Sequence, residues 1–225
     1  MDAYAATART RVKRMPKRGS YDRDTVHAIV DAALVCHVGY AIDGQPYVTP
    51  TAHWRDGERI YWHGSSASRM LRSLKPGGVP VCLTVTHIDG LVLARSAFNH
   101  SMNYRSVMAF GDAHLVDDAD HKLQALETFT NRLYPGRWAE LRPATAQELK
   151  ATTVLWLDLD EVSAKVRSGP PGDDAEDLAW PCWAGVVPMR TVMDAPIAEA
   201  HVPPGTPVPA YPGQQPAPRG APVPR

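Results

Sequence analysis

Three Asp-Gly pairs constrain the fold of this chain more than any other sequence feature. They are Asp43-Gly44, Asp56-Gly57 and Asp89-Gly90, and each lies between runs rich in β-branched and aromatic residues. An Asp-Gly pair favours a two-residue hairpin turn, because both residues tolerate positive φ. The sequence therefore predicts consecutive antiparallel hairpins.

The runs that flank these turns are predicted to be strands. They cover residues 34–42, 45–54, 59–63, 81–88 and 91–95, and further strands are predicted over 104–116 and 153–167. Pro46 and Pro50 lie in the second run. Because proline cannot donate to a strand ladder, this strand should be irregular or lie partly on a sheet edge.

Helical patterning is less common. Asp22 can cap a helix that runs to about residue 33, and residues 66–75 suggest a short helix. Residues 118–133 should form an amphipathic helix, since apolar side chains recur there at helical spacing: Leu123, Leu126, Phe129 and Leu133. Thr145 and Glu148 have the spacing of a capping box.

Many short antiparallel strands with few helices predict a mainly β fold, a closed or partly closed barrel. Strands do not alternate with long helices, which disfavours a doubly wound nucleotide fold. The sequence also contains neither G-x-G-x-x-G nor a P-loop, so the common phosphate-loop motifs are absent.

Composition divides the 225 residues into three parts: a basic arm over 1–20, the barrel domain over 21–190, and a Pro-rich tail over 191–225 that should be disordered. Lys plus Arg equals Asp plus Glu at 24 each, which gives no electrostatic case for nucleic acid as a partner. No apolar run approaches the ~20 residues of a membrane span. The three cysteines form no C-x-x-C pair, so a reducing, cytoplasmic location is expected.

The segment over 60–70 is the most informative for chemistry. A predicted strand ends at Gly64, serines follow, and a helix begins. Backbone N–H groups and the dipole at a helix N-terminus favour an anion. Ser65 and Ser68 add hydroxyl donors, and Arg69 can grip a phosphate with two parallel hydrogen bonds. The alternative is a serine helix cap with Arg69 in solvent.

A second segment places Tyr104, Arg105 and Ser106 together on a strand, where they could present aromatic and cationic groups to a ligand. The alternative is an ordinary amphipathic strand with Tyr104 in the core. The histidines match no zinc pattern such as H-E-x-x-H, so no metal site is predicted. A hydrolase built from Ser65, His63 and Asp89 is disfavoured, because no G-x-S-x-G elbow is present.

These segments resemble the pyridoxamine phosphate oxidase-like FMN-binding split-barrel family, in particular its branch of nitroimidazole-resistance and flavin-nucleotide-binding proteins. The resemblance covers about residues 15–190. Its matching pieces occur in order along the chain: Arg18-Gly19-Ser20, Cys36-His37-Val38-Gly39, Gln45-Pro46-Tyr47-Val48-Thr49-Pro50, Tyr61-Trp62-His63-Gly64-Ser65, Ser68-Arg69-Met70, Asn103-Tyr104-Arg105-Ser106-Val107, Phe110-Gly111, Pro135-Gly136-Arg137-Trp138, Ser163-Ala164-Lys165 and Trp183-Ala184-Gly185.

The resemblance implies a role for each matching position. Ser68 and Arg69 fall where the family binds the FMN phosphate. The strand that lines the flavin ring carries Thr49, Pro50 and Thr51, and Trp62 and His63 fall at the next strand end, near the isoalloxazine. Residues that would reach the cofactor of a partner subunit, or approach the flavin from the C-terminal region, are Tyr104, Arg105, Ser106 and Trp183.

The function that follows is transfer of electrons from reduced FMN to a small acceptor, in a homodimer with two flavins at the subunit interface. His63 would orient the acceptor or supply a proton, which its unperturbed pKa near ~6.5 suits. A nicotinamide nucleotide is one candidate donor. The chain lacks the oxidase's C-terminal arginine and histidine motif, which puts pyridoxamine phosphate oxidation in doubt. The alternatives are a non-enzymatic flavin-binding protein and a barrel that uses deazaflavin or haem.

Overall fold

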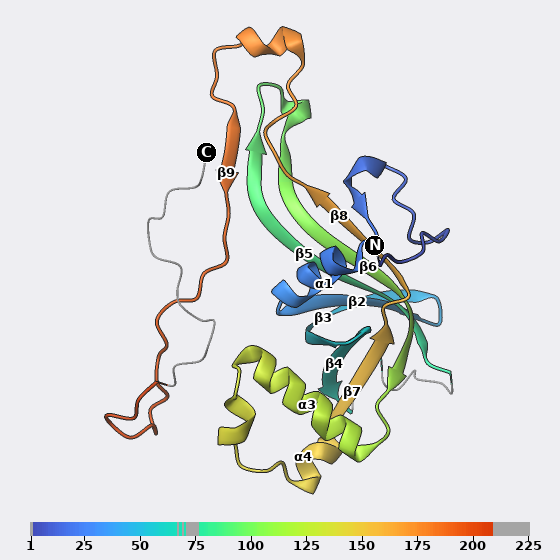
Figure 1. Ribbon diagram of the computed structural model, residues 1–225, viewed down its shortest axis with the longest axis vertical. Helices are drawn as coiled ribbons and strands as arrows, with labels where there is room; N and C mark the ends of the chain where they lie inside the picture. Colours follow the sequence, from blue (N-terminus) through green and yellow to red (C-terminus); the bar gives the residue numbers. More distant parts are fainter. Residues whose placement is uncertain (1, 67, 69, 71–76, 209–225) are drawn as a thin grey trace.

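A computed structural model describes residues 2–66, 68, 70 and 77–208 of the chain (Figure 1). In this part of the chain, nine strands form one antiparallel sheet in the order β1-β8-β6-β7-β4-β3-β2-β5-β9. They are β1 (Gly19–Ser20), β2 (Val35–Ile42), β3 (Gln45–Asp56), β4 (Arg59–Ser65), β5 (Val79–Leu93), β6 (Ser101–Leu115), β7 (Thr152–Asp158), β8 (Glu161–Arg167) and β9 (Gly185–Pro188).

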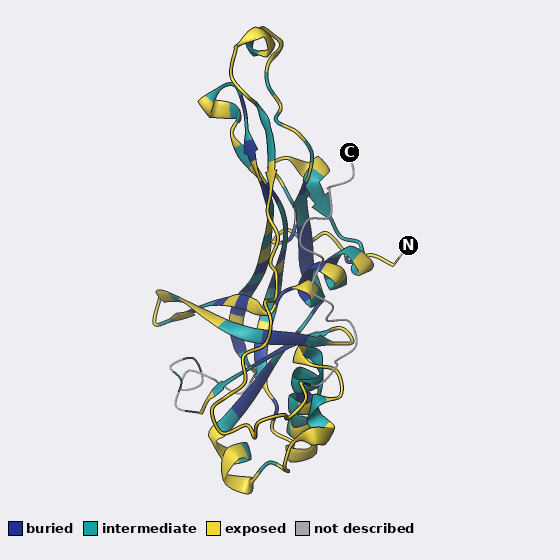
Figure 2. Ribbon diagram, turned by 90° about the vertical axis from the view of Figure 1, so that its left-hand side faces the viewer, coloured by how far each residue is buried: buried dark blue, intermediate teal, exposed yellow. Residues whose placement is uncertain are grey.

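A further pairing between β6 and β5 closes the strands from β6 to β5 into a barrel. Strands β8 and β1 extend the sheet from β6, and β9 extends it from β5. The long β5 and β6 continue beyond the barrel as a curved ribbon, with β9 beside β5 (Figure 1). Buried residues concentrate in the middle of the molecule, and the end of the ribbon is largely exposed (Figure 2). The mainly β split barrel predicted from the sequence is confirmed.

The described helices begin where the sequence predicted. The N-caps of α1 (Arg23–Ala32) and α3 (Ala119–Leu133) are Asp22 and Asp118, whose carboxylates accept backbone N–H bonds. The capping box of Thr145 and Glu148 starts α4 (Ala146–Ala151). Short 3-10 helices are η1 (Pro16–Arg18), η2 (Ala97–Asn99), η3 (Arg137–Glu140) and η4 (Ala175–Ala179). Most of the helix predicted over 66–75 lies outside the described residues. None of the described helices is long and apolar enough to cross a membrane.

Two of the three Asp-Gly pairs form hairpin turns, and the third does not. Gly44 and Gly57 have φ of 80° and 55° at the β2–β3 and β3–β4 turns. The turn predicted at Asp89-Gly90 is wrong, because β5 runs through it with a register shift between Ile88 and Gly90. The Asp89 carboxylate instead accepts bonds of 2.9 and 2.8 Å from Arg105 on β6. This ion pair holds the Asp89 side chain across the sheet, and the strand continues through Asp89-Gly90 without a turn.

The prediction of a single strand over 153–167 is also wrong, because this region forms two strands. The chain turns between β7 and β8, where the Leu159 N–H bonds the Glu58 carbonyl at 2.8 Å and the leucine side chain is fully buried. The prediction for the proline-containing strand is confirmed. The part of β3 up to Ala52 pairs with β2, whereas its pairing with β4 begins at His53, so the prolines lie on an edge.

The basic arm is packed against the barrel. Tyr4 is only 6% exposed and joins the main core, and its hydroxyl donates to Glu58 at 2.8 Å. Gly19 and Ser20 pair with β8. At the other end, residues 191–208 are exposed and contain neither helix nor strand, and 209–225 lie outside the described residues.

Buried His53 makes the stability of the fold depend on pH. Its Nε2 donates to the Val30 carbonyl at 3.1 Å, and the side chain is 1% exposed. Burial lowers its pKa from 6.5 to about 4. The unfolded chain therefore takes up this proton first, so stability is retained above about pH 6.5 and lost as the pH falls toward 4.

We expect this group to lower the free energy of unfolding by about 2 kcal/mol between pH 7 and pH 5. His53→Gln keeps an amide donor for the Val30 carbonyl but does not titrate. Urea unfolding of the parent and the variant at pH 7 and pH 5 should show a smaller decrease in the free energy of unfolding for the variant. Equal losses would show that other groups cause the acid sensitivity.

Candidate functional site

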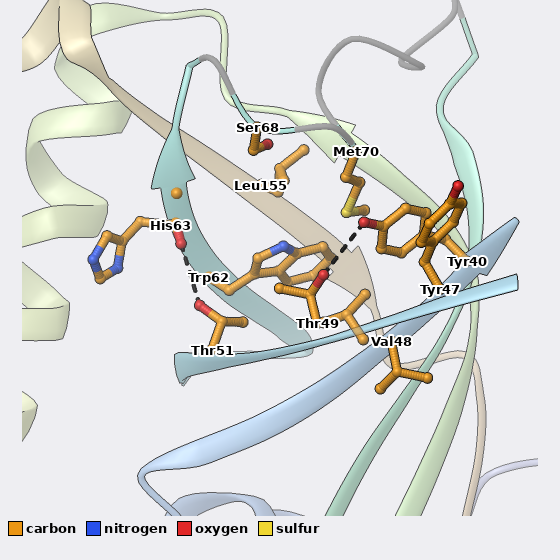
Figure 3. A pocket seen from close by; sticks show the side chains of 12 residues that line it. Tyr40, Tyr47, Val48, Thr49, Thr51, Trp62, His63, Ser68, Met70 and Leu155 are labelled. Carbon is orange, nitrogen blue, oxygen red and sulfur yellow. Dashed lines mark hydrogen bonds between the residues drawn. The ribbon is translucent and has the colours of Figure 1, made fainter. Parts of the chain in front are cut away.

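A cavity of about 320 Å³ opens between β2, β3 and β4, within the size range of small-molecule sites (Figure 3). Its walls come from three neighbouring strands, from β7 and from the residues that follow β4. The residues that line it are Val38, Tyr40, Tyr47, Val48, Thr49, Thr51, Trp62, His63, Gly64, Ser68, Met70 and Leu155.

Aromatic rings dominate this first cavity. Trp62 lies among the labelled side chains with its indole beside Thr49 and Leu155 (Figure 3). Tyr40 and Tyr47, which are directly opposite each other on β2 and β3, stack with centroids 5.7 Å apart. The Tyr40 hydroxyl lies 3.3 Å from Thr49 Oγ1. The cavity thus offers flat apolar surfaces with a few hydroxyl groups, a lining suited to a planar ring with polar edges.

Gly64 leaves part of the cavity open. Among the described residues, a Cβ atom placed here would meet nothing within 4 Å, and the glycine lies one residue before the end of β4. A ligand can therefore approach the backbone here more closely than it could beside a larger residue.

The His63 ring points away from the first cavity (Figure 3). Its carbonyl oxygen accepts a 3.3 Å hydrogen bond from Thr51 Oγ1, and its imidazole lies against Phe129 of α3 at 4.9 Å and Trp54 at 6.0 Å. Burial lowers the pKa of His63, and its buried Nδ1 has no hydrogen-bond partner in the part of the chain that the structure describes. In this arrangement the ring contributes to packing under α3.

The structure brings together five of the residues predicted to bind the cofactor. Thr49, Thr51, Trp62, His63 and Ser68 all line the first cavity.

The remaining predicted residues do not line this cavity. Pro50 is exposed on β3, and Ser65 is exposed at the end of β4. Arg69 lies outside the described residues. The Trp183 side chain is 65% exposed and lies against the backbone of Gly185.

The segment predicted to reach a partner is divided among three environments. Tyr104 lines a second cavity. Arg105 is held by Asp89 of its own chain, and this ion pair raises its pKa. Ser106 donates to the Lys165 carbonyl at 3.2 Å.

Sequence reasoning missed several residues of the first cavity. Val38 and Tyr40 alternate with exposed residues along β2, so strand periodicity could have placed them on the inner face. Leu155 comes from β7, which pairs with β4 nearly 100 residues away in the sequence. No local pattern could have found that contact.

The second cavity has a volume of about 480 Å³ and lies between the N-terminal arm, β6 and β8. Its lining includes four cationic side chains and no carboxylate. The lining residues are Arg14, Met15, Arg18, Phe98, Asn99, His100, Ser101, Tyr104, Lys165, Arg167 and Gly172. It shares no residue with the first cavity.

Comparisons with known proteins show which proteins this chain resembles. A family model described as pyridoxamine 5'-phosphate oxidase matches residues 22–166. The flavocytochrome Anf3 from Azotobacter vinelandii is 47% identical, with a TM-score of 0.87, over 92% of this chain and 96% of that one. The FAD and haem binding protein from Mycobacterium smegmatis is 39% identical, with a TM-score of 0.81, over 86% and 94%.

A candidate 5-nitroimidazole antibiotic resistance protein from Bacteroides thetaiotaomicron shares the fold at 21% identity and a TM-score of 0.53, over 66% of this chain and 86% of that one. No curated protein matches the chain.

The packing of His63 predicts how its substitutions affect stability. His63→Phe should keep the free energy of unfolding close to that of the parent, because a planar ring still fills the space beside Trp54 and Phe129. His63→Ala should lose about 2 kcal/mol, because it leaves a void. Urea unfolding measures both. If His63→Phe is as unstable as His63→Ala, the polar atoms of the imidazole stabilise the fold and its packing does not.

Proposed function

Because the chain belongs to the pyridoxamine 5'-phosphate oxidase family, we propose that it binds a flavin in the first cavity and passes electrons from the reduced flavin to a small acceptor. The observation that carries the proposal is the aromatic cavity of Trp62, Tyr40 and Tyr47, at the strand end where the sequence predicts an anion site. A bound flavin would supply the redox chemistry, and the protein supplies binding and orientation.

The residues present fit a flavin. The stacked Tyr40–Tyr47 pair and Trp62 offer apolar surfaces to a planar ring, and the space beside Gly64 admits it close to the backbone. Thr49 and Thr51 present hydroxyl groups to polar ring edges. Ser68 lines the same cavity and supports a phosphate position there. Arg69 is the proposed partner for that phosphate and lies outside the described residues.

The nucleotide form of the flavin is part of the proposal. The sequence resemblance implies FMN, whereas the Mycobacterium smegmatis relative is described as binding FAD and haem. We propose FAD, since that relative is 39% identical over 86% of this chain. Both it and the flavocytochrome support haem as a second group, which makes a two-cofactor redox protein the more specific form of the proposal.

A catalytic role for His63 remains a prediction that requires a different ring position, since the imidazole points away from the cavity.

A nicotinamide nucleotide is the proposed electron donor. A flavin-binding protein without turnover is the competing class, and reduction of the bound flavin by NADH or NADPH separates the two. The three free cysteines support a reducing, cytoplasmic location.

We also propose a homodimer formed through the outer face of the sheet. A row of directly paired residues crosses this face from β3 to β6: Pro50, His37, Thr84 and Met108. Met108 is 43% exposed and Val48, on the same face, is 66% exposed. An isologous contact between two such faces would cover these apolar side chains and bring a second chain toward the cavity mouth.

The flavin assignment predicts a yellow protein whose extracted cofactor has the mass of FAD. Gly64→Ile should fold normally, because the added side chain enters open space, but should weaken flavin binding at least about tenfold, or ~1.4 kcal/mol. Gly64→Ala should have a smaller effect. Flavin titration and circular dichroism would measure both properties. A folded Gly64→Ile protein with full affinity would contradict this location.

The dimer proposal predicts that Met108→Glu shifts the protein toward monomer in light scattering, because two carboxylates would be buried in the contact. Leu123→Glu is the matched control, since Leu123 is 37% exposed on α3 and away from this face. Equal effects of the two substitutions, or a parent protein that is already monomeric, would contradict the proposed interface.

A further inference from the structure

We propose that the second cavity is a haem site, in which His100 Nε2 would bind the iron and the surrounding cations would pair with the propionates. This inference rests on the proposed function, which brings a haem to this chain. It places the haem among residues that do not line the first cavity.

His100 has the hydrogen bonding of a metal-ligating imidazole. Its Nδ1 lies 2.8 Å from the Ser96 carbonyl oxygen. Because a carbonyl can only accept, Nδ1 carries a proton, and in the neutral ring the lone pair is then on Nε2. Ligating histidines commonly donate the other ring N–H to a backbone carbonyl in this way, which fixes the tautomer and the ring orientation. The residue is exposed, and among the described residues Nε2 has no hydrogen-bond partner.

Four of the other histidines use Nε2 within the fold. His27 pairs with Glu58, and His121 lies 3.2 Å from the Tyr61 hydroxyl. His53 and His87 donate Nε2 to carbonyls of α1.

A further comparison is with His37, an exposed residue on the outer face of the sheet whose side chain forms no hydrogen bond in the described part of the chain. It does not line either of the two cavities. His100 therefore combines a free Nε2, a fixed Nδ1 and a place in a cavity.

The positive charge of the second cavity is not balanced by acidic residues in its lining. Arg14, Arg18, Lys165 and Arg167 line it, and its lining contains no carboxylate. The two nearby aspartates have other partners in the described structure. Asp173 pairs with Arg95 at 2.7 Å, and Asp174 accepts from Asn99 at 3.4 Å.

Arg167 shows the imbalance most clearly. The residue is 9% exposed, and its hydrogen bonds go to the Asn103 side chain and to the carbonyls of Gly169 and Pro170. Its Nε is buried and has no hydrogen-bond partner among the described residues. Burial and the nearby Arg18 lower its pKa. A bound carboxylate would compensate this charge through charge-assisted hydrogen bonds, as guanidinium and carboxylate geometries allow.

The same cavity offers apolar surface for a large planar ring. Phe98, two residues before His100, is 93% exposed, and Tyr104 and Met15 complete this side of the lining. An almost fully exposed phenylalanine beside a cationic pocket indicates a surface that a ligand covers. The cavity thus offers apolar faces for the ring, cations for its acidic edge and an imidazole, which is one of the side chains that hold haem iron in proteins.

The test is haemin titration of the full-length protein, read from the Soret band and from the haem-to-protein ratio. The parent should bind one haem per chain. His100→Ala should bind at least about tenfold more weakly and shift the Soret band, and added imidazole should restore the parent spectrum. His37→Ala is the matched control and should bind as the parent does. Normal binding by His100→Ala would overturn the ligand assignment.

A second pair of variants tests the cations. Arg18→Glu should weaken haemin binding about tenfold, because a charge-assisted contact is lost. Lys17→Glu makes the same charge change one position away, outside the cavity lining, and should have little effect. Equal losses in both variants would indicate general electrostatic attraction and would overturn the propionate assignment.

These outcomes separate the inference from the proposed function. If the parent binds flavin but no haem, both the two-cofactor function and this site are wrong, while the flavin assignment stands. If the parent binds haem and His37→Ala alone abolishes it, the two-cofactor function stands and only the location is wrong. Flavin content should be unchanged in His100→Ala and Arg18→Glu, because neither residue lines the first cavity.

Discussion

The hydrogen bonds at the C-terminal end of α1 hold the structure together, because a helix leaves its last carbonyls without partners and this end is buried against the barrel. Side chains from three other elements satisfy them. His87 of β5 donates to the Ile29 carbonyl at 2.9 Å, and His53 of β3 donates to that of Val30 at 3.1 Å. Arg132 of α3 reaches the carbonyls of residues 30, 31 and 33. One helix end thus joins the ribbon strand, the barrel and the outer helix.

This junction also positions the first cavity. Strand β2 starts two residues after the last Arg132 contact, and its inward residues Val38 and Tyr40 form one wall of the cavity. His53 follows Thr51 on β3, and the His63 ring is packed beneath α3 next to Trp54. The residues that fix the strands and those that line the cavity therefore lie on the same segments. A substitution at the C-terminal end of α1 should therefore alter the shape of the first cavity through β2 and β3.

Local signals predicted the helix caps and two hairpins, because a capping aspartate or an Asp-Gly turn acts within a few residues. They failed where a distant partner decides the conformation. Asp89 forms an ion pair with Arg105 on β6, so the strand continues through a turn-like pair. The candidate site follows the same division. Thr49, Thr51 and Trp62 were identified from short matching segments, whereas Leu155 enters through the pairing of β4 with β7. The second cavity escaped detection because its cations come from the arm and from β8.

The two cavities differ in the chemistry of their linings. The first is built from aromatic rings and hydroxyl groups, and the second gathers four cations in a protein whose acidic and basic residues balance at 24 each. The positive field of the second cavity is therefore local, and the acids that neutralise it lie elsewhere on the chain. A charge concentrated in this way favours a ligand with acidic groups at one edge and selects against a neutral ring. With its acidic groups at one edge, haem would accordingly suit the second cavity, whereas the first cavity offers aromatic walls to a flavin ring.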